Sequence, residues 1–472
     1  MHDVVRDFAH WLTLTGENRF MVKGKLKEWP DMVESFECYT AIALWNCSSN
    51  IKFPDKVEFS KLKTLFLHGE EVGDLLVVSS TFFEEMKALQ VLFLSNVNFS
   101  LKGFHSLPNL KTLWCEYCKL ENFSSSLTNM RSLEILVLIS TRIDEISEEL
   151  VKLSTLKYLR LYGVEATMKI PPKLVSRLMS LQELYVTCIN NINLLELNSL
   201  SRLTALSLHL STNQFSQEDF VFPKLQRYDI DVGGFFFSSR EAPTIRRLRI
   251  QNFSSLSAFK NLFCNVGKLK LNNVSGLKNI VPSIGKKALN ELTSLELNSC
   301  KDMEFLTDLT GDQGSTVAFS NLVKLTIQSM LSLKGLCYGL SPSHPAIASF
   351  TRLTVVTIAS CPRLKTIFSP CLAQSMLCIE ELFICNCNGL EQVIGFAQEE
   401  EITKNGSRLC CYPKLRILKI DDCRSLKYVC SSTSTQGLQS LESVKISNCP
   451  QLMQIFKMEQ NENGQGVVVP QG

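Results

Sequence analysis

The 472-residue chain lacks several features that define common classes of protein. No apolar run is long enough to cross a membrane. The first residues, MHDVVRD, are charged where a secretory signal needs an apolar core. The formal net charge of +3 is too close to balance to favour nucleic acid or an anionic membrane as the general partner. We therefore expect a reducing compartment, the cytosol or the nucleus, and predict a cytoplasmic location without a membrane span.

The chain also lacks a recognisable catalytic or phosphate-binding constellation. Its six histidines are scattered and match no triad or metal spacing. No GxxxxGK[ST] phosphate loop occurs. A hydrophobic content of 45% with 20% charged residues is typical of a chain that buries a core. The sequence therefore predicts a folded protein that is not an enzyme and has no metal or cofactor of its own.

One apolar spacing, in contrast, recurs throughout the chain. From Leu353, apolar residues or cysteine occupy offsets 0, 3, 5, 8, 11 and 14, and the spacing to offset 11 returns from Ile379, Leu415 and Leu441. The alternation across offsets 3 to 5 predicts a short strand with one buried face. A pattern that returns at this interval predicts one structural unit stacked on copies of itself. The spacing is that of a leucine-rich repeat.

Seventeen strand starts of this kind can be placed, with a mean period of (441 − 39)/16, or about 25 residues. They are Tyr39, Leu62, Leu89, Leu110, Leu133, Leu156, Leu181, Leu203, Leu225, Ile245, Val266, Leu292, Leu322, Leu353, Ile379, Leu415 and Leu441. No coil buries its apolar face alone. We predict an α/β leucine-rich-repeat solenoid, a horseshoe with a parallel sheet on its concave face. Irregular loops and short helices, over 82–88 and 173–179, would cover the convex face, and the acidic insert 395–413 would be a mobile loop.

The eighteen cysteines are explained by the repeat. Seven stand at offset 8, where a small side chain packs inside the coil: Cys47, Cys118, Cys300, Cys361, Cys387, Cys423 and Cys449. Cys115 with Cys118, and Cys385 with Cys387, have spacings that suggest zinc, but neither pair supplies four convergent ligands. We predict structural cysteines without a disulfide framework.

Offset 4 maps the exposed face of the predicted sheet. It places Phe66, Phe93 and Trp114 on adjacent strands, as an exposed aromatic stripe, and Tyr185 further along. Clustered exposed aromatics are typical of contact sites. The stripe would bind a partner protein or dock against an adjoining module, and the sequence leaves both alternatives open.

A basic patch is predicted over two later coils. Arg249 and Lys270 stand at offset 4, and Arg246, Arg247 and Lys268 lie beside them. The patch would be a solvated face or a docking site. Aromatic residues are not interleaved with it, so the pattern does not indicate nucleic-acid binding.

The N-terminal segment 1–15 has the apolar periodicity of an amphipathic helix. His2 and Asp3 precede it, where a helix N-terminus holds an anion or is capped by a carboxylate. By physical chemistry alone, Asp3 is a cap and His2 an exposed side chain.

Met1-His2-Asp3, with the residues up to Asp7, resembles the MHD motif that ends the nucleotide-binding NB-ARC module of plant intracellular disease-resistance receptors, the coiled-coil NLR class. Segments 18–20, 26–30, 39–44, 82–92 and 170–172 are also similar to that family. The resemblance implies that His2 and Asp3 contact ADP or ATP in a full-length receptor and help to hold it inactive. It also divides the chain into the end of that module (1–25), the repeats (26–458) and a disordered tail (459–472).

The function that this resemblance implies is recognition within a plant innate immune receptor. The repeats would sense a pathogen effector or a guarded host protein, and they would hold an intramolecular nucleotide-binding domain inactive. Met1 would then be an internal residue of a longer receptor. Two alternatives remain: a free-standing protein-interaction scaffold, and a truncated decoy that regulates full-length receptors.

Overall fold

The computed structural model describes fourteen stretches of the chain. They are residues 19–29, 36–54, 57–102, 107–163, 170–187, 192–215, 220–234, 245–280, 290–308, 319–338, 350–373, 376–394, 412–431 and 440–457. The helix expected over 1–15, with His2 and Asp3, lies outside these stretches. So do the acidic run 399–401 and the tail 459–472.

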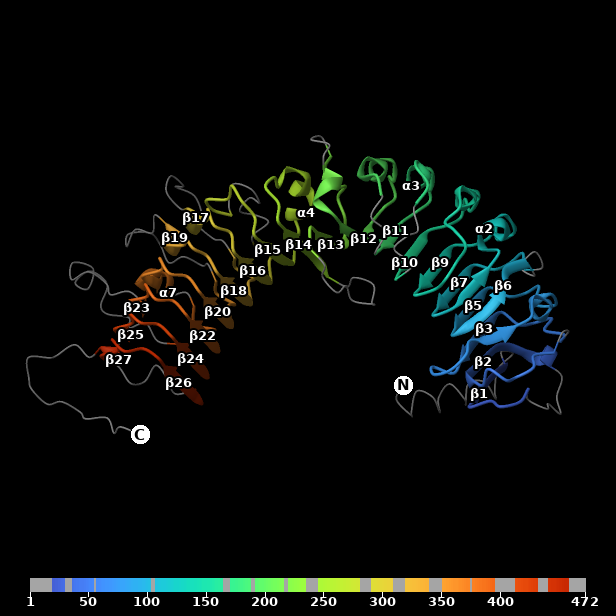
Figure 1. The fold of residues 1–472 in the computed structure, drawn as a ribbon, viewed down its shortest axis with the longest axis horizontal. Helices are drawn as coiled ribbons and strands as arrows, with labels where there is room; N and C mark the ends of the chain where they lie inside the picture. The colour runs from blue at the N-terminus through green and yellow to red at the C-terminus, as the bar shows by residue number, and fades with distance from the viewer. Residues whose placement is uncertain are drawn as a thin grey trace, which may run out of the picture. The chain divides into compact units, whose positions relative to one another are not determined.

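The chain divides into two compact units, each a stack of coils. The N-terminal unit holds residues 1–230 and 236–244, and the C-terminal unit holds 231–235 and 245–472. The principal sheet has 18 strands (Figure 1), and its described pairings are parallel. A strand follows each of the seventeen predicted starts, so that prediction is confirmed.

The N-terminal unit contributes the first strands of this sheet. They are β1 (Arg19–Gly24), β2 (Tyr39–Cys47), β3 (Thr64–Gly69), β5 (Val91–Ser95), β7 (Thr112–Glu116), β9 (Ile135–Ile139), β10 (Tyr158–Tyr162), β11 (Glu183–Val186), β12 (Ala205–Leu210) and β13 (Arg227–Val232), which crosses the unit boundary. The sequence analysis missed β1 and assigned its residues to the preceding module. Met21 pairs with Ile42 in parallel register and is buried with it, so residues 19–24 belong to the sheet.

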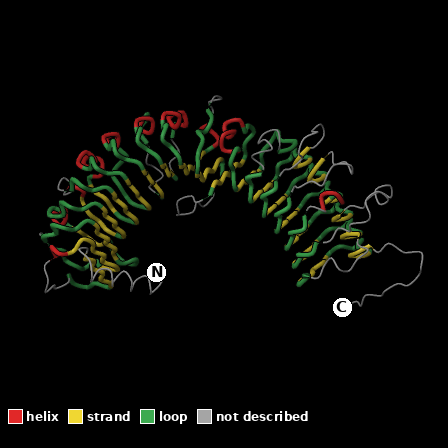
Figure 2. The backbone as a smooth tube through the Cα atoms, turned by 180° about the vertical axis from the view of Figure 1, so that it is seen from behind, coloured by secondary structure: helices red, strands yellow, loops and turns green. Residues whose placement is uncertain are grey.

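Short elements form the other side of the N-terminal coils. They are η1 (Phe36–Cys38), β4 (Leu76–Val78), η2 (Ser80–Phe83), β6 (Val97–Ser100), β8 (Lys119–Glu121), α2 (Phe123–Ser126), η4 (Leu127–Asn129), η5 (Glu148–Lys152), α3 (Leu174–Arg177), η6 (Leu194–Ser199) and η7 (Thr212–Phe215). In each unit the helices lie away from the principal sheet (Figure 2). The helix expected over 82–88 is instead a 3-10 turn that begins at Ser80, and the one expected over 173–179 contains α3.

The C-terminal unit continues with eight strands of the principal sheet. They are β14 (Arg246–Gln251), β15 (Lys268–Asn272), β16 (Ser294–Asn298), β18 (Lys324–Gln328), β20 (Val355–Ala359), β22 (Glu381–Cys385), β24 (Ile417–Asp421) and β26 (Ser443–Ser447). No helix of the described residues in either unit is both long and apolar enough to span a membrane.

In the C-terminal unit, the side of the coils opposite the principal sheet contains more strands than predicted. It holds η8 (Ser257–Phe259), α4 (Lys260–Phe263), β17 (Phe305–Asp308), β19 (Gly335–Tyr338), β21 (Thr366–Phe368), α7 (Pro370–Ala373), β23 (Gln392–Ile394), β25 (Tyr428–Ser431) and β27 (Gln454–Lys457). β17 pairs with β19, and β21, β23, β25 and β27 form a second parallel sheet. The expectation of only loops and helices was therefore incomplete. Buried residues such as Val393 and Val429 follow offset 11 in extended backbone, where the neighbouring coil supplies a strand to pair with.

Many coils are entered through a turn that the apolar spacing did not include. In ten coils the residue three positions before the strand start is buried, and its carbonyl accepts a hydrogen bond from the amide at the strand start. Leu62 N lies 3.1 Å from Phe59 O, Leu353 N 3.1 Å from Phe350 O, and Leu415 N 3.1 Å from Tyr412 O. The buried side chain therefore anchors the entry of these coils.

Most strands of the principal sheet are followed by a second recurrent turn. Asn46, Ser299, Asn386 and Asn448 hold φ values of 54°, 54°, 52° and 55°, in the left-handed region. Asparagine tolerates that region better than most residues, because its short side chain bonds locally. The next residue is the offset-8 cysteine in each of these four coils. The chain thus turns sharply at this residue, and the thiol of the following cysteine points into the coil.

The predicted role of these cysteines is confirmed. The thiol of Cys361 lies 3.3 Å from Ala359 O, and that of Cys423 lies 3.5 Å from Asp421 O, so each satisfies a carbonyl in its own turn. Both cysteines are fully buried, and the cysteines described are free thiols. Among the described residues, no group of three or more His, Cys, Asp or Glu is placed to hold a metal ion.

Candidate protein-interaction surface

Four aromatic rings follow one another across the exposed face of β2, β3, β5 and β7. The ring centroids of Trp45 and Phe66 are 6.4 Å apart, those of Phe66 and Phe93 5.4 Å, and those of Phe93 and Trp114 6.0 Å. Phe66, Phe93 and Trp114 are directly paired in the parallel register. The predicted adjacency of these three is confirmed. Separations of this size are favourable for aromatic pairs, so the rings form one ordered surface.

β1 extends this surface, and the sequence analysis did not find the extension. Phe20 and Val22 flank the buried Met21 and are 45% and 55% exposed, and Trp45 is 42% exposed. Val22 pairs with Ala43, which pairs with Phe66. The alternation around Met21 was the signal for a strand, but the resemblance had placed these residues in another module. We call Phe20, Val22, Trp45, Phe66, Phe93 and Trp114 the N-terminal aromatic face.

Polar groups lie at the strand ends beside this face. The indole Nε1 of Trp114 donates to Oε1 of Glu116 at 2.8 Å, which fixes the plane of the ring. The imidazole of His68 lies 5.5 Å from the ring of Trp45. An apolar centre with a polar rim is the usual anatomy of a protein interface. The geometry therefore suits contact with a protein.

Tyr185 does not belong to this surface, and its prediction as an exposed contact residue was wrong. Its side chain is only 3% exposed, and its hydroxyl donates to Glu183 Oε2 at 2.5 Å. The ring of Tyr158 lies 5.1 Å away, and Arg227 bonds the other oxygen of Glu183 at 2.8 Å. Burial raises the pKa of Tyr185 above its ordinary value. Val137, Arg160, Ser207 and Asp229, which stand at the same offset 4 of their coils, are likewise buried.

The basic patch is present, but much of its charge is neutralised. Three of its five basic side chains form ion pairs: Arg249 with Asp231, Lys270 with Glu296 at 2.6 Å, and Arg246 with Glu291 at 3.4 Å. The side chain of Asp231 has no exposed surface, and that of Arg249 is only 13% exposed. These pairs favour a structural role over a docking site for Arg249 and Lys270. Lys268 is exposed and Arg247 is half-buried.

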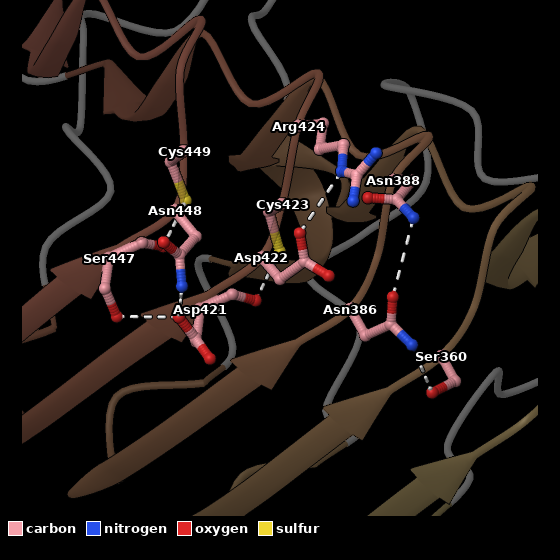
Figure 3. Close-up of polar contacts among 10 residues, drawn as sticks. All are labelled: Ser360, Asn386, Asn388, Asp421, Asp422, Cys423, Arg424, Ser447, Asn448 and Cys449. Atoms are coloured by element: carbon pink, nitrogen blue, oxygen red, sulfur yellow. Dashed lines mark hydrogen bonds and ion pairs between the residues drawn. The ribbon is translucent and has the colours of Figure 1, made fainter.

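A polar ladder joins the exit turns of the last coils (Figure 3). Asp421 accepts hydrogen bonds from Ser447 Oγ at 2.7 Å and from Asn448 Nδ2 at 2.9 Å, and these bonds hold the pKa of its carboxyl below the ordinary value. Asn386 Nδ2 donates to Ser360 Oγ at 3.2 Å in the same way. The ladder ties each turn to the next coil. Its partners satisfy one another, so we interpret it as structural.

The solved structures that resemble this chain share its stacked coils. A leucine-rich-repeat protein of Leptospira interrogans superposes with a TM-score of 0.51 at 18% identity, over 83% of this chain and 93% of that protein. This chain has the leucine-rich-repeat fold. A TDR receptor gives a TM-score of 0.49 at 16% identity, over 88% of this chain and 79% of the receptor, and adds nothing to that conclusion.

Sequence comparison indicates which type of leucine-rich repeat the chain contains. The family model described as plant disease resistance protein RPS2-like, leucine-rich repeats, matches residues 245–388 and 393–470 of this leucine-rich-repeat chain. The disease resistance protein At4g27190 of Arabidopsis thaliana is 25% identical over 510 residues, which cover 96% of this chain and 47% of that protein. The chain thus spans about half the length of this relative. The matches support repeats of the plant disease-resistance type and lend no specific support to the motif at Met1–Asp3.

Proposed function

We propose that this chain is the ligand-sensing and autoinhibitory repeat region of a plant innate immune receptor. The N-terminal aromatic face is the observation that carries the proposal, because it offers four adjoining rings on a rigid sheet. The matches to plant disease-resistance repeats and to a disease resistance protein support the biological setting.

The aromatic face has the physical properties of an anchor for a protein partner. Each ring is held by its neighbours, so little side-chain freedom is lost on binding. Trp and Tyr side chains carry much of the binding energy in protein interfaces. Two kinds of partner are consistent with the face: a pathogen effector or guarded host protein, or a nucleotide-binding domain of the same receptor. A ligand that activates the receptor must bind the released state more tightly than the closed one.

An alanine replacement of the stripe separates these partners. Phe66→Ala/Phe93→Ala/Trp114→Ala is compared with Thr64→Ala/Val91→Ala/Thr112→Ala, which alters the neighbouring outward row of the same three strands. Each set is introduced into the native full-length gene product, expressed in leaves and scored for cell death with and without the pathogen. Cell death without pathogen indicates docking on the receptor's own domain. Loss of the triggered response indicates effector or host-protein binding. Unchanged responses, with circular dichroism showing a folded protein, would remove the face from the mechanism.

In this proposal, an upstream domain of the receptor binds the nucleotide. His2 and Asp3 would contact ADP or ATP there, within a cytoplasmic receptor of the NLR class. Native size tests the assignment, by immunoblot of source tissue with an antibody against the repeats. A band well above 53.2 kDa supports the receptor. A band at that mass supports the alternative, a free-standing scaffold or decoy without a nucleotide switch.

A further inference from the structure

One acidic side chain stands on the N-terminal aromatic face, at the end of β7. The five described strands β2, β3, β5, β7 and β9 contain no lysine, arginine or aspartate, and Glu116 is their single glutamate. His68, the one histidine of these strands, lies two strands away, because it pairs with Ser95 and Ser95 pairs with Glu116. These strands therefore give the face a carboxylate and no lysine or arginine to balance it.

This carboxylate is held in place without being neutralised. Glu116 is half-buried, and its Oε1 accepts the hydrogen bond from Trp114 Nε1 at 2.8 Å. Among the described residues Glu116 forms no ion pair, whereas Glu134, which precedes β9 at the opposite end of the strands, pairs with Lys111 and Lys157. Oε2 of Glu116 therefore remains available as an acceptor, beside an indole ring whose plane is fixed.

A partner that covers the aromatic rings must also cover this carboxylate. The ring of Trp114 lies 6.0 Å from that of Phe93 and is bonded directly to Glu116, so the ring and the carboxylate lose water together. Removing a carboxylate from water is unfavourable unless a cation and further hydrogen bonds compensate for the lost hydration. One hydrogen bond from a neutral indole does not supply that compensation. A purely apolar partner would therefore bind weakly, and a partner that brings a cation would bind more tightly.

Arginine is the cation that suits this geometry best. Its guanidinium is planar, so it stacks on an aromatic ring and donates to a carboxylate at the same time. Tryptophan is the aromatic residue that attracts a cation most strongly. The ammonium of lysine is more strongly hydrated and would lose more on burial. Trp114 and Glu116 together therefore offer both contacts that a guanidinium makes.

We propose that the N-terminal aromatic face binds a protein segment through an arginine, whose guanidinium stacks on the ring of Trp114 and donates to Oε2 of Glu116. Apolar side chains of the same segment cover Phe66 and Phe93 on the neighbouring strands. This inference rests on the proposed use of the face for binding, and it adds the chemical class of the partner. A second copy of the chain is less suited, because a symmetric contact would bring two Glu116 carboxylates into one interface without a cation.

Selection from a random peptide library displayed on phage tests the proposal with the full chain. Peptides are selected on the wild-type chain after depletion on the Phe66→Ala/Phe93→Ala/Trp114→Ala variant, which removes binders to other surfaces. We expect the enriched peptides to contain arginine beside apolar or aromatic residues. Glu116→Gln keeps an acceptor for the indole and should weaken these peptides by about tenfold, as loss of one charged hydrogen-bonded pair does.

The matched control is Glu121→Gln, in β8 of the same coil. It removes an exposed carboxylate that Lys119 pairs with at 3.2 Å, and it should leave the affinity unchanged. A second measurement changes the peptide instead of the protein, by replacing its arginine with citrulline, the uncharged analogue. Wild type should lose as much affinity with the citrulline peptide as Glu116→Gln loses with the arginine peptide. The two changes together should cost little more than either alone, because they remove one contact.

Several results would overturn this proposal. Enriched peptides without arginine, or with lysine in its place, would contradict the stacked guanidinium but would leave the face as a binding surface. Fully additive losses in the two-change comparison would exclude Glu116 as the partner of the arginine. Failure to find any peptide that separates wild type from the triple variant would remove both the arginine contact and the face. A doubled mass in light scattering, lost in the triple variant, would mean that a second copy covers the face.

The leaf assay separates this proposal from the proposed function. Arginine-dependent peptides together with unchanged leaf responses would support the arginine contact and contradict the receptor role. Changed leaf responses in the triple variant, with Glu116→Gln behaving as wild type in both assays, would support the receptor role and contradict the arginine contact.

Discussion

The carboxylate of Asp231 in β13 is shielded from solvent and paired with the guanidinium of Arg249 in β14, whose Nη2 lies 2.7 Å from Oδ2. Nε of the same guanidinium bonds the other carboxylate oxygen, so the contact is bidentate. A planar guanidinium matches a carboxylate in this arrangement, and both charges gain hydrogen bonds that replace water. Arg249, although it stands in the basic patch, is therefore largely buried and contributes to the packing of the coils.

Loss of the Arg249 guanidinium should lower the free energy of unfolding substantially. Arg249→Ala removes the bidentate partner of a buried carboxylate, and we expect about 3–5 kcal/mol of destabilisation. The matched control is Arg246→Ala, which removes the exposed pair with Glu291 and should cost at most about 1 kcal/mol. Urea unfolding followed by circular dichroism gives both values. Similar midpoints for the two variants would contradict the structural role of Arg249.

Gly389 lies against the backbone of the preceding coil. An added Cβ would fall within the van der Waals radius of the carbonyl oxygen of Pro362, which cannot move without shifting the coil. We expect Gly389→Ala to destabilise by about 1–3 kcal/mol, as overpacking usually does. In Gly335→Ala the new methyl meets the ring of Phe305 at an ordinary 3.5 Å, so that variant serves as the control. Equal unfolding midpoints for the two would show that the coils adjust freely.

Thiol reactivity should separate the inward cysteines from the exposed ones. Burial raises the pKa of Cys47 to about 12 and raises that of Cys300, so few thiolates form near neutral pH and reagents do not reach them. Cys264 and Cys385 are exposed. Iodoacetamide, with sites identified by mass spectrometry, should label the exposed pair first in the native protein and all four in denaturant. Equal native rates for Cys300 and Cys264 would contradict the burial.

The last coils should loosen in acid through Asp421. Its pKa is lowered in the folded protein, mainly because Ser447 and Asn448 donate to the carboxylate. A lowered pKa contributes stability above the unfolded value, near 3.8, and that contribution is lost as pH falls through the folded value. Asp421→Asn carries no charge to titrate. The difference in melting temperature between wild type and this variant should shrink from pH 6 toward pH 3. A difference that stays constant would exclude Asp421 as the titrating group.

Much of the fold was predictable because the same apolar spacing recurs in each coil of a repeat protein. Seventeen strand starts followed from the apolar spacing, and the inward cysteines followed from offset 8. β1 was not found, because its residues lack the coil spacing and show only the alternation around Met21. The outer strands β21 and β23 were not found either. A strand of three residues is set by its neighbour in space rather than by its own sequence.

The candidate surface depended more on tertiary structure. The pattern placed Phe66, Phe93, Trp114 and Tyr185 at one offset, and only packing showed that three of them form a surface while Tyr185 is buried beside Tyr158. In the same way, the basic residues were visible in the sequence, but the carboxylate that pairs with Arg249 was not identifiable. Periodicity determines which side of a strand a residue occupies, because it is a local property of the backbone. Exposure and ion pairing depend on the size and charge of side chains from neighbouring coils, and those contacts exist only once the coils are stacked.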